Sequence, residues 1–185
     1  MVNDILAEAK SEMNKAVEAF QREVATVRTG RANASLLDMI RVEYYGSQVP
    51  VNQVATVTIP EPRLIVLQPF DKTVIPELEK AIQQSNLGLT PSNDGNLVRL
   101  PIPQLTEERR KELVKVVHGM SEECKVSVRN HRRDANDMVK DGQKDGEIPE
   151  DDAKRASDQI QKLTDEFTCK IDELLADKEA EIMEV

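Results

Sequence analysis

The chain has 185 residues, enough for one or two small domains whose hydrophobic core needs no disulfide bonds. No stretch approaches the roughly 20 apolar residues of a membrane-spanning helix, and the N-terminus lacks the uncharged run of a signal peptide, so we expect a cytoplasmic protein without a membrane contact. The 25 basic and 34 acidic residues give a net charge of −9, which would argue against a nucleic-acid partner if the charge were spread evenly.

The first 29 residues predict one amphipathic helix. Apolar side chains recur there at steps of three and four, which places them on one face of a helix about 25 residues long. They are Ile5, Ala9, Met13, Ala16, Phe20, Val24 and Val27.

Residues 31–104 have a different pattern, with short apolar runs between turn residues. Valine, isoleucine and tyrosine are enriched in these runs, which predict strands. We expect strands at 40–45, 54–59, 64–67 and 97–100, and a short helix that begins at Pro76. A segment of about 70 residues is comparable to a small independent domain.

Two more long helices are predicted in the remainder of the chain. Thr106 caps the first of them, which has its apolar stripe at Leu113, Val117, Met120, Cys124, Val128, His131, Ala135 and Met138. The glycine-containing stretch 141–146 predicts a turn, so this helix is expected to end early, near Gly142. The second begins at Pro149, with its stripe at Ala153, Ala156, Ile160, Leu163, Phe167, Ile171 and Leu174.

These elements predict an α+β protein. Three amphipathic helices of this length bury their stripes against one another, so residues 1–29 and 106–185 are expected to form a three-helix bundle, with 31–104 inserted as a β-rich domain. The chain passes between the two domains near 29–31 and 101–106, which makes both segments candidate hinges. The residues expected to act there are Gly30, Pro101, Pro103 and Leu105.

Charge is distributed unevenly along the chain. Residues 105–140 contain 9 basic and 7 acidic residues, whereas 141–185 contain 6 basic and 15 acidic residues. On the 105–140 helix the basic residues and one histidine gather on a side away from the apolar stripe; they are Lys111, Lys115, His118, Lys125, Arg129, Arg132 and Arg133.

This basic face has two interpretations. Charged residues on a helix usually form a solvated face paired with nearby acids, and Glu122 lies among these. The dense run 129–133 favours phosphate binding, because guanidinium groups grip phosphates bidentately. Four further arginines near the domain junction would extend the surface: Arg28, Arg31, Arg109 and Arg110. An aromatic content of 3% without tryptophan argues against base stacking, so we expect contact mainly with the RNA backbone.

No motif for catalysis or metal binding is found, so we predict that the chain is not an enzyme and needs no cofactor or metal. The 141–152 stretch partly matches a calcium-binding loop, but Gln143, Pro149 and Asp152 stand where that loop needs other groups. His131 lies within an apolar stripe and is expected to be a core or interface histidine. Cys124 and Cys169 lack metal or redox spacing and are expected to be core side chains in a reducing compartment.

From these patterns alone, a coiled-coil adaptor or holdase that binds other proteins is an alternative, because long helices and an acidic surface suit it equally well. A titration of binding against salt separates the two hypotheses, since only the RNA contact is expected to weaken strongly as salt rises.

Four segments in order resemble the signature sequences of bacterial ribosome recycling factors, and the similarity covers the entire chain. They are Thr29–Ala32, Val42–Gly46, Leu105–Lys111 and Arg129–Asn136. The resemblance implies an L-shaped monomer, similar in outline to transfer RNA, in which a hinge joins a three-helix bundle to a β/α/β sandwich. It also implies action with elongation factor G and GTP to split the post-termination ribosome into subunits. By the same resemblance, Arg132 makes the central contact with 23S rRNA of the large subunit, and Arg129 and Arg133 flank it.

Overall fold

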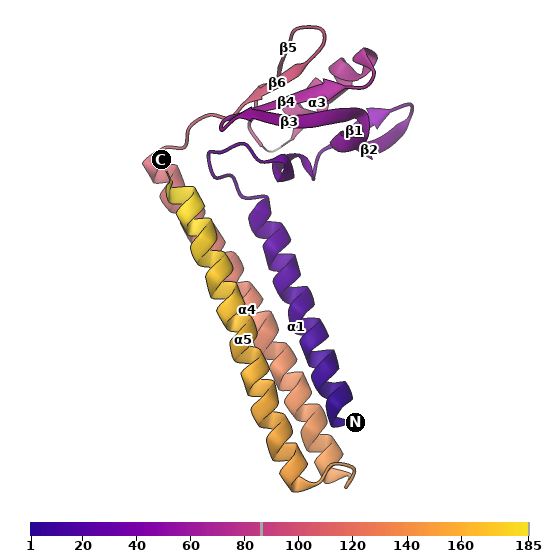
Figure 1. Ribbon diagram of the computed structural model, residues 1–185, viewed down its shortest axis with the longest axis vertical. Coiled ribbons are helices and arrows are strands. Elements are labelled where there is room, and N and C mark those ends of the chain that lie inside the picture. The colour runs from indigo at the N-terminus through magenta and orange to yellow at the C-terminus, as the bar shows by residue number, and fades with distance from the viewer. Residues whose placement is uncertain (86, 185) are drawn as a thin grey trace. The chain divides into compact units, whose positions relative to one another are not determined.

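The computed structural model describes residues 1–85 and 87–184. They form two compact units, one made of Met1–Val24 with Lys111–Val185 and the other of Ala25–Arg110. The first unit is helical and the second contains the strands, so the chain is an α+β protein (Figure 1).

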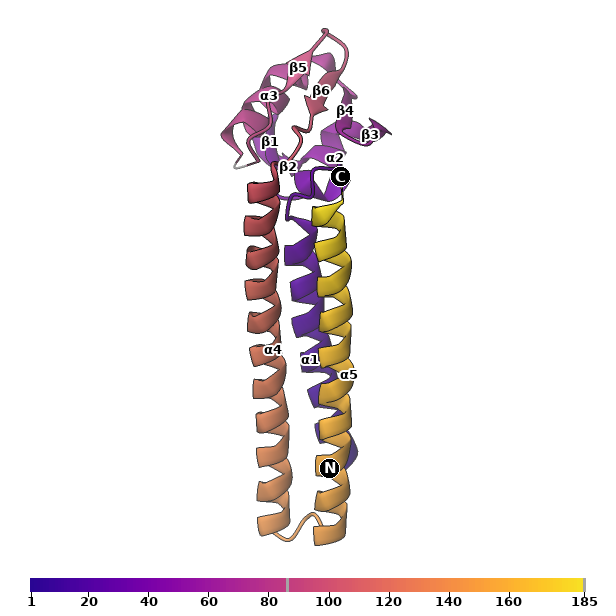
Figure 2. The ribbon, with the colours of Figure 1, turned by 90° about the vertical axis from the view of Figure 1, so that its left-hand side faces the viewer.

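Three long helices build the first unit: α1 (Val2–Ala25), α4 (Glu107–Lys144) and α5 (Glu150–Met183). They run side by side in Figures 1 and 2. Among the side chains that they enclose, the largest are Met13, Phe20, Ile160, Phe167, Ile171 and Ile182, each at most 2% exposed. Most positions of the three predicted stripes therefore lie in the core. In the first helix, Val17 is buried where Ala16 was predicted, and Val27 lies beyond the end of α1.

The register of the stripes differs from the prediction at several positions. Met138 is 44% exposed, and its neighbour Val139 is buried in its place. Leu163 and Leu174 are only half-buried, whereas Thr164 and Leu175 are buried. Each helix packs against two neighbours, so its buried face is broad and drifts around the axis instead of following a single 3–4 series.

The predicted early end of the second long helix is wrong, because α4 continues through Gly142 to Lys144. Gly146 ends it in the left-handed conformation, with φ of 77°. The amide of Gly146 donates to the Gln143 carbonyl at 3.1 Å, and that of Glu147 donates to the Gly142 carbonyl at 2.9 Å. These two hydrogen bonds form the Schellman motif, which satisfies the last carbonyl groups of a helix.

The second unit contains two antiparallel sheets. One is the hairpin of β1 (Arg41–Tyr44) and β2 (Ser47–Pro50). The other has the order β3-β4-β6-β5, and its strands are β3 (Ala55–Glu61), β4 (Leu64–Pro69), β5 (Ser92–Asn93) and β6 (Val98–Pro101).

Short helices complete this unit: α2 (Val51–Val54), α3 (Ile75–Gln84) and two 3₁₀ turns, Ala34–Leu37 and Lys72–Val74. Strands and helices enclose a separate core, in which the most deeply buried residues are Val42, Ile65, Leu67, Leu78, Ile82, Val98 and Leu100. The predicted strands and the helix at Pro76 are therefore present. β2, α2 and β5 were not predicted, because β2 and β5 are short and mainly exposed and α2 is a single turn.

Candidate nucleic-acid interface

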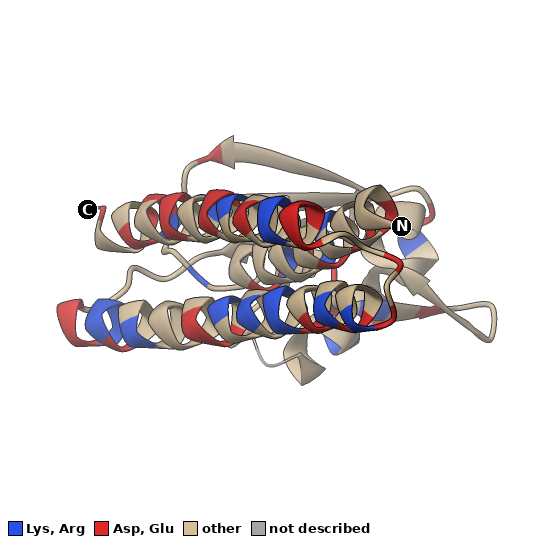
Figure 3. Ribbon diagram, turned by 90° about the horizontal axis from the view of Figure 1, so that it is seen from below, with Lys and Arg blue, Asp and Glu red and all other residues tan. Residues whose placement is uncertain are grey.

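The balance of charge differs between α4 and α5, since α4 has 10 basic and 8 acidic residues and α5 has 5 basic and 11 acidic residues. Figure 3 shows lysine and arginine spread along α4 among acidic residues, and mainly acidic residues along α5, which ends at the C-terminus. The difference follows the composition of the two segments, since 15 of the 34 acidic residues lie in 141–185. The basic face predicted from the sequence therefore belongs to one helix and borders an acidic one.

Two of the arginines predicted to bind RNA, Arg129 and Arg133, are exposed on α4. The Nε atom of Arg129 donates to the carbonyl of Lys125 one turn earlier, at 3.2 Å. This bond directs the side chain along its own helix and leaves the two terminal nitrogens available to a partner.

Lys125 is held more tightly than the sequence indicated. Its Nζ atom lies 2.7 Å from an oxygen of Asp172 on α5 and 3.7 Å from Glu122. The hydrogen bond to Asp172 raises the pKa of Lys125 above its ordinary value, against the opposing effect of burial. In this conformation Lys125 is paired with protein carboxylates, so a phosphate would have to compete with Asp172 for it.

Arg132 lies half-buried at the edge of α4 that faces α5. Its Nη1 atom donates to Oε1 of Gln161 at 3.4 Å, and Nε2 of Gln161 donates to Oδ1 of Asp165 at 2.9 Å. Arg132, the residue that the family resemblance singles out, is therefore contacted from α5 by the amide of Gln161 and not by a carboxylate.

The other four predicted arginines belong to the second unit, which spans Ala25–Arg110. Arg31 and Arg109 are exposed, whereas Arg28 and Arg110 are half-buried. Burial, and then the charge of Arg109, lower the pKa of the Arg28 guanidinium. The predicted RNA-binding set is therefore divided equally between the two units.

The two segments predicted as hinges contact each other within the second unit. The Nη2 atom of Arg28 donates to the carbonyl of Pro103 at 3.1 Å. Gly30 has φ of 79°, and a Cβ atom there would lie 3.4 Å from Cγ of the buried Leu105. Pro101 ends β6 and, like Pro103, is exposed. The left-handed φ favours glycine at position 30, and the Cβ of any other residue there would contact the buried Leu105.

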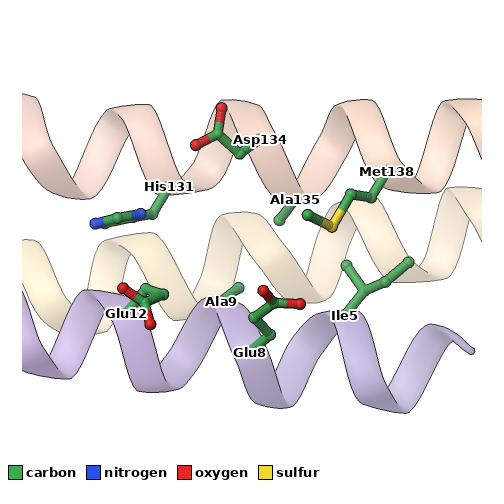
Figure 4. Close-up of a pocket in the computed structure, with 8 residues that line it drawn as sticks. All are labelled: Ile5, Glu8, Ala9, Glu12, His131, Asp134, Ala135 and Met138. Carbon is green, nitrogen blue, oxygen red and sulfur yellow. The ribbon is translucent and has the colours of Figure 1, made fainter.

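A groove between α1 and α4 contains the remaining cluster of titratable groups (Figure 4). Its lining combines carboxylates, one histidine and apolar side chains: Ile5, Glu8, Ala9, Glu12, His131, Asp134, Ala135 and Met138. His131 is half-buried at this helix interface, as predicted. Lys15 accounts for most of the lowered pKa of Glu12, and the charge of His131 adds a smaller effect.

Both cysteines were predicted from the sequence to be core side chains. Cys124 is buried, but Cys169 is exposed, so its prediction as a core residue is wrong. Across residues 1–85 and 87–184, no cluster of three His, Cys, Asp or Glu side chains could hold a metal ion. Within the same part of the chain, no helix is long and apolar enough to cross a membrane.

Fold and surface together define a class of α+β protein, in which a long three-helix bundle presents a group of arginines on one helix. Comparison with known proteins identifies the family. Residues 20–183 match the model of the family described as ribosome recycling factor. Ribosome-recycling factors of Bacillus pumilus and Bacillus subtilis are 58% and 56% identical to this chain over the full length of each protein. The chain belongs to the ribosome recycling factor family.

Solved structures agree with this assignment. A solution structure of a ribosome recycling factor is 46% identical and superposes with a TM-score of 0.83, covering 100% of this chain and 98% of that one. A second, 48% identical with a TM-score of 0.70 over all of both chains, comes from models of the T. thermophilus factor and E. coli elongation factor G bound to the E. coli post-termination complex. The resemblance to bacterial ribosome recycling factors is confirmed, and the match favours a ribosome recycling factor over an adaptor or holdase.

The α5 partners of the basic residues were missed by the sequence reasoning. Gln161 and Asp165 lie one helical turn apart, a spacing that predicts a hydrogen-bonded pair on one helix. Nothing in the sequence relates that pair to Arg132, because the contact depends on how α4 and α5 align.

Proposed function

We propose that this chain, with elongation factor G and GTP, splits the post-termination ribosome into its subunits, and that its bundle binds 23S rRNA of the large subunit through α4. Membership of the ribosome recycling factor family supports the ribosome as the partner. A relative 48% identical to this chain is represented together with elongation factor G on a post-termination complex, which supports the second partner. In this proposal elongation factor G binds the nucleotide.

The observation that carries the RNA contact is the arginine group on α4. Arg129 and Arg133 are exposed, and Arg132 lies between them in sequence at the edge of the helix. Arginine suits contact with a folded RNA because each guanidinium binds phosphate oxygens in a fixed geometry. Such binding is read from RNA shape and weakens as salt rises.

Filter binding to 50S subunits tests this contact. Arg132→Gln is expected to weaken binding about tenfold or more, as for the loss of a charge-assisted hydrogen bond. It should also reduce the slope of log affinity against log salt by about 1. Arg155→Gln is the matched control, because Arg155 is an exposed arginine of α5 that pairs with Asp152 of its own helix. Equal affinity and equal slope for both variants would refute the RNA contact.

The second part of the proposal is that the long-helix bundle and the β-rich domain of residues 31–104 move relative to each other about residues 29–31 and 101–106. Gly30 supports it, since its left-handed φ lies in a segment that packs on the other linker at Leu105. Gly30→Ala is expected to cost about 1–2 kcal/mol of backbone strain and to slow splitting of 70S ribosomes, followed by light scattering.

Gly88→Ala serves as the control for this hinge variant. Gly88 has φ of 66°, and apart from its chain neighbours no atom of the described residues would lie within 4 Å of a Cβ there, so the substitution imposes similar strain away from the linkers. If the two variants split ribosomes at the same rate, the hinge proposal fails, because strain alone would explain the result.

A further inference from the structure

Along the contact between α4 and α5, the α5 partners of the α4 side chains are carboxylates at some positions and an amide at another. His118 contacts the carboxylate of Glu179, and Lys125 lies 2.7 Å from that of Asp172. Arg132, by contrast, faces the neutral side chain of Gln161. A neutral partner at this point is unexpected from composition, because 141–185 contains 15 acidic residues and only 6 basic ones.

The amide of Gln161 has a fixed orientation. Its Nε2 atom donates to Oδ1 of Asp165 at 2.9 Å, and an ionised carboxylate only accepts hydrogen bonds. The amide nitrogen must therefore face Asp165, which leaves Oε1 directed toward Nη1 of Arg132 at 3.4 Å. Asp165 thus anchors the amide, and the amide in turn contacts the guanidinium.

This arrangement orients a guanidinium without neutralising it. A guanidinium has five N–H donors, and the contact with Gln161 uses one of them. We infer that Gln161 is a positioning residue for RNA binding, which holds Arg132 at the edge of α4 with its charge and remaining donors available to a phosphate. This inference rests on the proposed function, because it assigns Arg132 to the RNA contact.

Neutrality of residue 161 is the essential feature. A carboxylate there would pair bidentately with Arg132, as arginine and carboxylate groups commonly do, and would occupy the donors that a phosphate needs. Lys125 shows the result of such pairing, because Asp172 already holds its ammonium group. An amide provides the same position and a similar shape without that competition.

The test compares two glutamines of α5 in binding to 50S subunits at several salt concentrations. Gln161→Glu is expected to weaken binding by a factor of about 2 to 5 relative to Gln159→Glu. This factor corresponds to the free energy of an exposed ion pair, which a phosphate would have to break to reach Arg132. Gln159 is exposed on the same helix, so both variants carry the same net charge. Because a carboxylate at position 161 would neutralise Arg132, Gln161→Glu should also reduce the salt slope by up to about 1.

Two further variants separate positioning from a structural role. Gln161→Met keeps the shape and loses the hydrogen bond, so affinity should fall while the salt slope stays near that of the wild type. In an Arg132→Gln background, Gln161→Glu should weaken binding no more than Gln159→Glu does. Thermal unfolding of each variant shows that the bundle is folded.

The outcomes also separate this inference from the proposed function. If Arg132→Gln binds like the wild type, the RNA contact itself is wrong. If Arg132→Gln weakens binding but Gln161→Glu and Gln159→Glu have equal affinity and salt slope, only the positioning role of Gln161 is overturned. The positioning role is also overturned if Gln161→Glu has its full effect in the absence of Arg132.

Discussion

Gly119 and Gly142 both lie within α4, yet the same substitution is expected to have opposite effects on stability. At Gly119 a Cβ atom would have no neighbour within 4 Å among the described residues outside the backbone of its own helix. At Gly142 it would lie 2.7 Å from Cδ1 and 3.0 Å from Cγ1 of Ile148, and 3.3 Å from Sδ of Met1. Replacing a helical glycine with alanine stabilises the helix by about 1 kcal/mol at either site. Only at Gly142 would the added methyl group crowd its neighbours.

The size of the overpacking cost follows from the position of Ile148. This side chain is 3% exposed, and its own amide donates to the Gly142 carbonyl at 3.0 Å, so it has little freedom to withdraw. Inserting a methyl group into a packed site typically costs about 1–3 kcal/mol. Gly119→Ala should therefore stabilise the bundle by about 1 kcal/mol, whereas Gly142→Ala should change its stability by roughly 0 to −2 kcal/mol.

Thermal unfolding followed by helical circular dichroism measures this difference, because the long helices contribute most of the signal. For a chain of this size, 1 kcal/mol corresponds to about 2–4 °C in Tm. Gly119→Ala is expected to melt above the wild type and Gly142→Ala at or below it. Equal stabilisation by the two substitutions would refute the close packing of the α4–α5 turn.

Other predictions concern buried polar groups of the bundle. Lys178 is 6% exposed and its ion-pair partner Glu181 is exposed, so Lys178→Met should stabilise the bundle by about 1–3 kcal/mol. Burial lowers the pKa of Lys178 below 10.5, so the folded state binds fewer protons in the window below 10.5 and wild-type stability rises with pH there. The gap in urea-unfolding stability between variant and wild type should narrow as pH rises toward 10.5; a constant gap would contradict the burial. Burial also raises the pKa of Cys124 to about 11, whereas Cys169 is exposed, so a thiol reagent at pH 8 should modify Cys169 first, as peptide mapping would show. Faster labelling of Cys124 would contradict the packing.

Helices were easier to predict than the small sheet domain, for a physical reason. A long amphipathic helix repeats its pattern many times, so one ambiguous position such as Met138 shifts the stripe without hiding the element. β5 contains two exposed residues and is defined by its pairing with β6, which no local pattern of Ser92 or Asn93 indicates. The end of α4 was misjudged because Gly142 usually indicates a break, whereas here its missing side chain makes room for Ile148.

What the sequence by itself determined is the order of the long helices and the longer strands, the approximate apolar faces of the three long helices, the presence of arginines on one side of α4, and the family. Tertiary structure decided which of those basic residues have partners in the bundle. Lys125 is paired with Asp172, and Arg132 meets Gln161, which is 29 residues further along the chain. These contacts depend on the alignment of α4 with α5 across the turn at Gly146. Helical periodicity places a residue on a face, but only the packed helices determine which residue of the neighbouring helix lies opposite it.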